Sequence, residues 1–219
     1  MIHMPPARRI FVATTNPGKL RDFRGAAAGM GVEVEPLPDF KNVPAAVEDG
    51  HTFEQNARIK AEHYSRYLSG DFSGELVLAD DSGLAVDALD GAPGVHSARY
   101  AARLRGSPDI HQNSDDKDNN RALIRQLEQL PEENRWGKFV CVIAAAKKGA
   151  TLNVFAGEVR GKLLTVARGD QGFGYDPLFY FPDLRKTFAE ISPEHKANYS
   201  HRGKAFRAFL EWYRNQAAG

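Results

Sequence analysis

Two adjacent carboxylates in the middle of the chain indicate a possible site for a divalent cation. Asp80 and Asp81 follow the apolar run Leu76–Ala79, which is typical of a strand that ends at the first of the two. Proteins often hold Mg²⁺ with one or two carboxylates plus water and substrate phosphates. If the strand continues, neighbouring residues face opposite sides, so one carboxylate would face a ligand and the other would accept hydrogen bonds elsewhere. A plain acidic turn is the alternative interpretation.

A second segment has the composition of an anion site. It joins an apolar run to a helical pattern and reads Thr14, Thr15, Asn16, Pro17, Gly18 and Lys19. Backbone N–H groups of such a turn and the positive start of a helix attract phosphate, and a lysine adds a point charge. The spacing is not that of a P-loop. An ordinary strand-to-helix turn with an exposed lysine explains the same residues.

A glycine-rich stretch near the C-terminal third offers surfaces for a nucleobase. It reads Gly172, Phe173, Gly174, Tyr175, Asp176 and Pro177. Two glycines allow a ligand close to the backbone, and an aromatic ring can stack on a base, worth about 1–3 kcal/mol. The aspartate adds a hydrogen-bond acceptor. The competing interpretation is a structural loop whose aromatic residues belong to the core.

Cations gather before and at the start of the last predicted helix. Lys196 precedes Ser200, a good N-cap, and His201 and Arg202 then fall in the first helical turn. Cations at that end oppose the helix dipole, so their placement is easier to explain if an electronegative ligand group lies nearby. Solvated side chains at a helix start are the alternative.

The elements that must position these residues are mixed along the chain. Apolar runs predict strands at residues 9–14, 32–37, 76–79 and 84–89, and a hairpin formed by residues 136–147 and 151–160. Apolar residues at helical spacing predict helices after Pro17, after Thr52, over Arg121–Leu130 and from about His201 onward. Strands mixed with helices and at least one hairpin predict an α/β fold with a mixed sheet.

The helix after Thr52 is the best specified. Thr52 and Gln55 have the spacing of a capping box, and Asn56, Lys60 and His63 share one face of the helix. Glu54 and Arg58, four residues apart, are expected to pair. By contrast, the polar and turn-rich segment Ala101–Asn120 predicts an exposed, mobile loop.

Composition sets broad limits on function. The 219 residues include 29 Lys plus Arg and 28 Asp plus Glu, a net charge of +1, so a large basic footprint for nucleic acid is not expected. Cys141 is the only cysteine and lies in an apolar run, which predicts a buried thiol and excludes an intramolecular disulfide. Without a membrane-length apolar run, or a signal-peptide core in Met1–Arg9, we expect a cytoplasmic protein.

Several motifs in order resemble the inosine triphosphate pyrophosphatase, or Ham1-like, family, in its bacterial form. They are Ala13–Lys19, Phe53–Ala57 with Lys60-Ala61, Ala79–Asp87, Gly91–Val95, Ser97–Tyr100, Gly172–Pro177 and Ser200–Ala205. The resemblance covers nearly the whole chain and departs from the family pattern at Leu104–Asn120, which is longer than usual. It implies a single domain over residues 1–219, with two lobes of a mixed sheet flanked by helices around a central nucleotide-binding cleft.

The resemblance also implies an activity and a set of roles. The activity is Mg²⁺-dependent hydrolysis of non-standard purine nucleoside triphosphates (ITP, dITP and XTP) to the monophosphate and pyrophosphate, by a homodimer. Asp81 would be the catalytic base and a metal ligand, with Glu54 as a second metal candidate. Substrate would bind to Thr14, Thr15, Asn16, Pro17, Gly18, Lys19, Ser82, Phe173, Gly174, Tyr175, Asp176, Lys196, His201 and Arg202.

Two other functions stay open at this point. One is a Maf-like nucleotide pyrophosphatase acting on pyrimidine or modified nucleotides, against which the Gly172–Pro177 and Ser200–Arg202 motifs argue. The other is a nucleotide-binding protein without catalysis, against which the intact Asp80, Asp81 and Lys19 argue. A substrate panel that measures pyrophosphate release separates all three.

Overall fold

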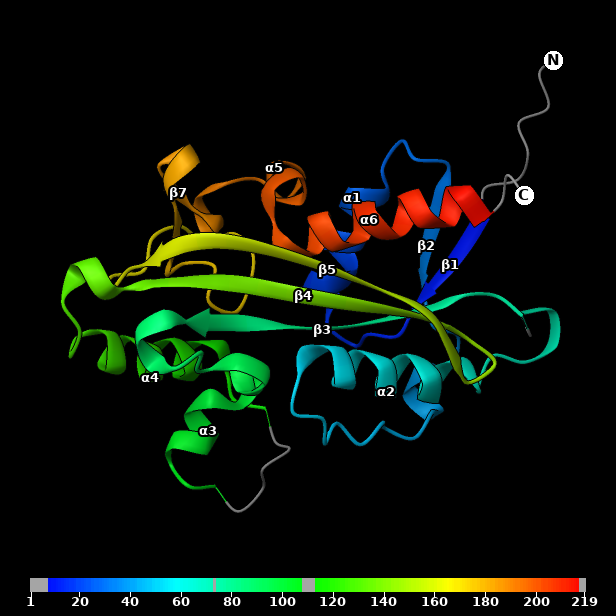
Figure 1. The fold of residues 1–219 in the computed structure, drawn as a ribbon, viewed down its shortest axis with the longest axis horizontal. Coiled ribbons are helices and arrows are strands. Elements are labelled where there is room, and N and C mark those ends of the chain that lie inside the picture. Colours follow the sequence, from blue (N-terminus) through cyan, green and yellow to red (C-terminus); the bar gives the residue numbers. More distant parts are fainter. Residues whose placement is uncertain (1–7, 73, 108–112, 217–219) are drawn as a thin grey trace. The chain divides into compact units, whose positions relative to one another are not determined.

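The computed structural model describes residues 8–72, 74–107 and 113–216 (Figure 1). Its strands are β1 (Arg8–Val12), β2 (Val32–Pro36), β3 (Val77–Val86), β4 (Trp136–Lys147), β5 (Ala150–Leu163), β6 (Phe179–Phe181) and β7 (Lys186–Thr187). Its α-helices are α1 (Pro17–Ala27), α2 (Phe53–Ser65), α3 (Tyr100–Leu104), α4 (Asp116–Leu127), α5 (Pro193–Tyr199) and α6 (His201–Gln216). Short 3₁₀ turns join several of them.

The strands form one seven-stranded sheet in the order β2-β1-β3-β4-β5-β6-β7. Strand β1 pairs in parallel with β2 and β3, whereas β6 pairs antiparallel with β5 and β7. Lys148 and Gly149, with φ of 51° and 80°, make the two-residue turn between β4 and β5. Positive φ at both positions is what a type I′ hairpin requires. The predicted mixed α/β class and the hairpin are confirmed.

The chain divides into two compact units. Unit 1 contains the described parts of residues 1–81, 142–156 and 205–219, and unit 2 contains those of residues 82–141 and 157–204. Strands β3, β4 and β5 therefore each contribute residues to both units. Within β3 the division falls at the peptide bond between Asp81 and Ser82.

Each unit has its own apolar core. In unit 1, the β1 residues Ile10 and Phe11 are fully buried, and Phe23 of α1 packs against Phe206 of α6 with ring centres 5.4 Å apart. The core of unit 2 is built from β3, α4, β4 and the segment after β5. Its buried residues include Leu84, Leu123, Leu127, Phe139, Leu178, Phe179 and Phe188. These cores fix the backbone around the predicted site residues in both units.

The prediction that a strand ends at Asp80 and another starts at Leu84 is wrong. Strand β3 runs without interruption from Val77 to Val86, so the acidic pair lies inside a strand and not in a turn. Asp80 and Asp81 interrupt the apolar pattern, but hydrogen-bond and ion-pair partners on α1 and α2 offset the cost of burying them. The expected second strand stops at Val86, and a 3₁₀ turn covers Asp87–Leu89.

The predicted loop Ala101–Asn120 is also partly wrong. Helix α3 occupies Tyr100–Leu104 and helix α4 already begins at Asp116. The side chain of Asp115 accepts a hydrogen bond from the Lys117 amide and so caps α4, which starts five residues before the predicted Arg121. Residues 108–112 of the predicted loop lie outside the described residues.

Two predicted helix caps are confirmed. Thr52 and Gln55 form the capping box of α2. Ser200 Oγ accepts a hydrogen bond from the Gly203 amide at 3.1 Å, as expected of the N-cap of α6.

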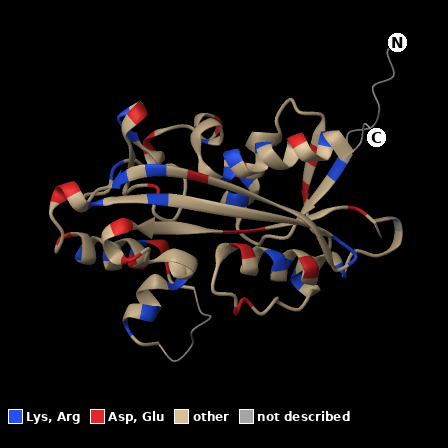
Figure 2. Cartoon of the chain, in the orientation of Figure 1, with Lys and Arg blue, Asp and Glu red and all other residues tan. Residues whose placement is uncertain are grey.

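The distribution of charged residues over the structure agrees with the balanced composition. Basic and acidic residues are interspersed along the elements, as Figure 2 shows. Among the residues described, the helices are too short or too polar to cross a bilayer.

Candidate active site

The carboxylates of β3 point to opposite faces and have different partners, as the strand geometry predicts. Asp80 Oδ2 lies 2.9 Å from Lys19 Nζ on α1, and its side chain is 1% exposed. Asp81 is also buried, but its partners come from α2. Asp80 therefore holds Lys19 of the predicted anion site (Thr14–Lys19, the anion loop) in place, while Asp81 belongs to a separate cluster.

The Asp81 cluster contains two residues of helix α2. Asn56 donates from Nδ2 to Asp81 Oδ2 at 3.2 Å, and Lys60 Nζ lies 3.2 Å from Asp81 Oδ1. Lys60 Nζ also lies 2.7 Å from Glu48 Oε2. One ammonium group thus serves two carboxylates, which leaves the cluster with an excess of negative charge.

Burial and charge shift the proton affinities in this cluster. Burial raises the pKa of Asp81, although the ammonium groups of Lys60 and Lys19 oppose the rise. Burial alone would lower the pKa of Lys60, but the carboxylates of Asp81 and Glu48 outweigh it and raise that pKa. Lys60 therefore stays charged at neutral pH, and Asp81 is a stronger proton acceptor than an exposed aspartate.

The sequence alone did not indicate Glu48, Asn56 or Lys60 as functional. Spacing placed Asn56 and Lys60 on one face of α2, and a lysine there was a usable signal. Glu48 lies in an irregular segment that Asn56 organises, since Asn56 Oδ1 accepts a hydrogen bond from the Gly50 amide at 2.9 Å. A Cβ on Gly50 would meet that same oxygen at 2.6 Å, so the close approach requires glycine.

Glu54, the predicted second metal ligand, has a different neighbour. Its carboxylate pairs with Arg58 Nη2 at 2.8 Å in an exposed i,i+4 ion pair, which confirms the expected pair. Two residues of helix correspond to a rotation of about 200°, so Glu54 and Asn56 lie on opposite faces of α2. The structure brings Glu48, not Glu54, to Lys60 and Asp81.

The anion loop is held mainly by its own side chains. Asn16 Oδ1 accepts hydrogen bonds from the amides of Gly18 (2.8 Å) and Lys19 (3.1 Å) and caps α1. Thr14 Oγ1 accepts from the Asn16 amide at 3.1 Å. Thr15 and Pro17 are exposed. The amides of Gly18 and Lys19 therefore donate to Asn16, and the positive charge of the segment comes from Lys19 Nζ, which pairs with Asp80.

Unit 2 holds the remaining predicted site residues, and two of them, Lys196 and Arg202, lie beside the ring of Phe173. Phe173 is partly exposed, with Lys196 Nζ 4.9 Å and the Arg202 guanidinium 5.4 Å from the centre of its ring. Arg202 is 2% exposed and donates from Nη2 to Ser82 Oγ at 2.8 Å. Thus Ser82, Phe173, Lys196 and Arg202 form a second cluster.

Asp176 fastens the loop that carries Phe173. Its Oδ2 accepts a hydrogen bond from the Phe173 amide at 2.9 Å and lies 2.5 Å from Lys196 Nζ, in a pair that is almost fully buried. A Cβ on Gly172 would meet the same oxygen at 2.1 Å. Glycine is required there for close approach, and φ of 78° favours it further.

Tyr175 and His201 pack with their rings inside unit 2. The Tyr175 ring belongs to the core of unit 2, its hydroxyl donates to the Ser97 carbonyl at 2.9 Å, and burial raises its pKa. His201 is buried and stacks on Phe139, with ring centres 4.8 Å apart. The alternative interpretation, core aromatics that pin the loop, therefore holds for Tyr175.

Asp81 and Glu48 suit a magnesium ion. No group of three or more His, Cys, Asp or Glu side chains able to hold a metal occurs in the part of the chain that the structure describes. Mg²⁺ does not need one, because it keeps water ligands and uses one or two carboxylates together with substrate phosphates. Two carboxylates that already converge on one cation fit that requirement.

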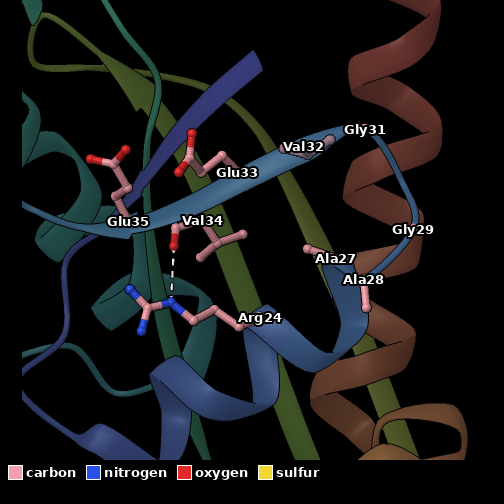
Figure 3. A pocket seen from close by; sticks show the side chains of 9 residues that line it. All are labelled: Arg24, Ala27, Ala28, Gly29, Gly31, Val32, Glu33, Val34 and Glu35. Atoms are coloured by element: carbon pink, nitrogen blue, oxygen red, sulfur yellow. Dashed lines mark hydrogen bonds between the residues drawn. The ribbon is translucent and has the colours of Figure 1, made fainter. Parts of the chain in front are cut away.

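A separate hollow of unit 1 contains none of the predicted site residues. It is an open pocket of about 540 Å³ between the end of α1 and β2, where Arg24 donates to the Val34 carbonyl at 3.1 Å (Figure 3). Glu33 and Glu35 also line it. Its acidic rim does not suit a phosphate.

Known structures share this fold. A Ham1 protein from Staphylococcus aureus superposes with a TM-score of 0.76 and 35% sequence identity, covering 95% of this chain and all of that one. A HAM1 protein from Coxiella burnetii gives 0.77 and 34%, covering 95% and 99%. The class is therefore that of the Ham1 proteins.

Sequence relatives agree with the structural comparison. The model of the Ham1 family matches residues 10–212, and the chain belongs to this family. A dITP/XTP pyrophosphatase from Acidobacterium capsulatum is 47% identical over 204 residues, which cover 93% of this chain and 97% of the relative. One from Geobacillus kaustophilus is 42% identical, with 97% of both chains covered.

Proposed function

We propose that this protein hydrolyses non-standard purine nucleoside triphosphates, namely ITP, dITP and XTP, to the monophosphate and pyrophosphate. The observation that carries the proposal is the buried Asp81, held by Asn56 and Lys60 and followed directly by Ser82, the hydrogen-bond partner of Arg202. Membership of the Ham1 family and the relatives described as dITP/XTP pyrophosphatases support it.

The proposed reaction is attack of water on the α-phosphorus. Asp81 accepts the proton of the attacking water, the new P–O bond forms, and the bond from the α-phosphorus to the bridging oxygen breaks, so pyrophosphate leaves. Lys19 compensates phosphate charge near Asp80. Asn56 and Lys60 orient the Asp81 carboxylate, since each contacts a different oxygen of it.

Magnesium is part of this proposal. Asp81 and Glu48 would hold the ion together with phosphate oxygens and water. A bound Mg²⁺ would neutralise charge on the phosphates and on the leaving pyrophosphate. Glu54, exposed and paired with Arg58, is the weaker candidate for this role.

Base selection falls to the cluster of unit 2. A purine can stack on Phe173, and the 6-oxo group of hypoxanthine or xanthine can accept hydrogen bonds from a nearby donor such as Arg202 or His201. Adenine carries a 6-amino donor at that position and would leave a buried donor unmatched, which is costly. We therefore expect strong preference for ITP and XTP over ATP.

Two further properties belong to the proposal. We propose that the protein acts as a homodimer, which light scattering coupled to size-exclusion chromatography tests. We also propose that it acts in the cytoplasm, where nucleoside triphosphates are used, and cell fractionation tests this.

A substrate panel tests the proposed function. Pyrophosphate release is measured with Mg²⁺ from ITP, XTP, dITP, GTP, ATP, CTP and UTP, using the wild-type protein and Asp81→Asn. Release from ITP and XTP with little from ATP, abolished by the substitution, supports the proposal. Activity mainly on pyrimidine nucleotides favours a Maf-like enzyme, and nucleotide binding without any release favours a silent binder; either result overturns it.

A further inference from the structure

In the loop that carries Phe173, the backbone of Gly174 is hydrogen-bonded to helix α4. Its amide donates to Asp116 Oδ2 at 2.7 Å, and its carbonyl accepts from Asn120 Nδ2 at 3.0 Å. Asp116 and Asn120 are four residues apart on α4 and so lie on the same face of the helix. Both polar groups of one backbone residue are thus held by two side chains of one helix.

Helix α4 is firmly fixed at the end that makes these contacts. Asn119 Oδ1 accepts from the Ala101 amide at 2.9 Å, and Asn119 Nδ2 donates to the Ala98 carbonyl at 3.1 Å. On the same helix, Leu123 and Leu127 are fully buried in the core of unit 2. A helix anchored on both sides can impose its position on a loop that has little regular structure of its own.

The neighbours of Gly174 have their own anchors, Phe173 on Asp176 and Tyr175 in the core of unit 2, whereas the amide and carbonyl of Gly174 are held by α4. Gly174 has a φ of 60°, and a Cβ placed on it would meet nothing within 4 Å, so the space on that side of the residue is open. The buried Oδ1 of Asn120 lacks a hydrogen-bond partner among the described residues. Turning the amide over would place Oδ1 against the Gly174 carbonyl, two acceptors facing each other, so the hydrogen bond to the loop determines the observed orientation.

We propose that Asp116 and Asn120 are positioning residues that determine base selectivity by fixing the Phe173 loop from α4. Phe173 directly precedes Gly174, and its ring lies against Lys196 and Arg202, the cations near which the base is proposed to bind. Displacement of Gly174 would move the ring relative to those donors. This effect on selectivity rests on the proposed function, whereas the attachment of the loop can be measured without turnover.

The test compares Asp116→Ala/Asn120→Ala with Asp118→Ala as a matched control. Asp118 is also an acidic residue in the first turn of α4, but among the described residues its carboxylate pairs with Arg105 and Arg121, in exposed ion pairs of 3.8 and 3.5 Å. Both variants keep Asp115 as the helix cap. The control therefore reproduces the loss of helix-dipole compensation without touching the loop.

Hydrogen exchange of the Phe173 and Gly174 amides is the readout that does not depend on activity. We expect exchange about tenfold faster in the double variant and unchanged in Asp118→Ala. Asp116→Asn keeps an acceptor for the Gly174 amide and should restore most of the protection. The single variant Asn120→Ala, which leaves the Asp116 contact intact, replaces the double variant if the latter does not fold.

Kinetics then test the consequence for base choice. We expect the ratio of kcat/KM for ITP to that for ATP to fall about tenfold in the double variant, mainly through a higher KM for ITP, and to stay unchanged in Asp118→Ala. If the Phe173 and Gly174 amides of the double variant exchange no faster than in the wild-type protein, the proposed attachment of the loop to α4 is wrong. If they exchange faster but the ITP-to-ATP ratio is unchanged, the proposed role of Asp116 and Asn120 in base choice is wrong. If the wild-type protein is inactive on every nucleotide, the proposed function fails, and the exchange result alone decides on the attachment.

Discussion

Lys60 Nζ lies 3.2 Å from Asp81 Oδ1, and the same nitrogen lies 2.7 Å from Glu48 Oε2. The ammonium group therefore balances two carboxylates, one of which is nearly excluded from water. Removing one partner of a buried ion pair leaves an uncompensated charge, at a cost of about 3–5 kcal/mol. The stability of unit 1 and the chemistry of Asp81 consequently depend on the same lysine.

Lys60→Met should destabilise the protein by about 3 kcal/mol at pH 7.5. The pKa of Lys60 is raised in the folded state, so its contribution is fully present below the ordinary lysine pKa of about 10.4 and is lost only as the pH rises beyond it. Urea denaturation measures the loss. The matched control on the same helix is Arg58→Met, which breaks an exposed pair and should cost less than about 1 kcal/mol. Equal losses of unfolding free energy in the two variants would contradict the claim that Lys60 and Asp81 form a buried ion pair.

Glu48→Gln should raise the Mg²⁺ concentration needed for half-maximal pyrophosphate release by about 10- to 100-fold, because it removes one of two carboxylates that converge on one cation. Glu54→Gln should change this Mg²⁺ concentration by less than about twofold, because Glu54 lies on the opposite face of α2 from Asn56 and pairs with Arg58. Mg²⁺ titration of turnover measures both. If Glu54→Gln has the larger effect, Glu48 is not the second ligand.

Arg202→Lys should lower kcat/KM for ITP by about 10- to 100-fold and for ATP by only a few-fold, because a planar guanidinium that donates to Ser82 and lies over Phe173 is replaced by a point charge. Steady-state kinetics on both nucleotides measure the change, with circular dichroism as a check of folding. Similar losses on the two substrates would remove Arg202 from base selection.

Gly172→Ala and Gly174→Ala separate steric contact from backbone strain. Both glycines have positive φ, which costs an L-residue about 1–2 kcal/mol. At Gly172 the new Cβ also meets Asp176 Oδ2 at 2.1 Å, whereas at Gly174 it meets nothing within 4 Å. We expect Gly172→Ala to be the more destabilising in urea, by at least about 1 kcal/mol more. The reverse order would show that Asp176 is not fixed where the structure places it.

The sequence predicted those features that depend on local spacing. The capping box of Thr52 and Gln55, the N-cap Ser200 and the turn at Lys148-Gly149 each involve residues within a few positions of one another, and each is confirmed. Hydrogen bonds between near neighbours depend little on the rest of the fold, so their patterns carry over from one protein to another.

Features that depend on distant partners could not be predicted in this way. The continuity of β3 through Asp80 and Asp81 rests on Lys19, Asn56 and Lys60, which come from other elements. Glu48 lies in an irregular segment that Asn56 of α2 contacts through the Gly50 amide, and it reaches the site by pairing with Lys60. The early start of α4 was hidden because its first turn is polar and serves the Phe173 loop.

The position of attack on the triphosphate tests the central claim most directly. ITP is hydrolysed with Mg²⁺ in water enriched in ¹⁸O, the products are separated, and mass spectrometry measures the ¹⁸O content of each. Attack on the α-phosphorus, with Asp81 as the base, predicts that IMP carries the label and that the pyrophosphate does not. Label in pyrophosphate, or formation of IDP and orthophosphate, would contradict the account.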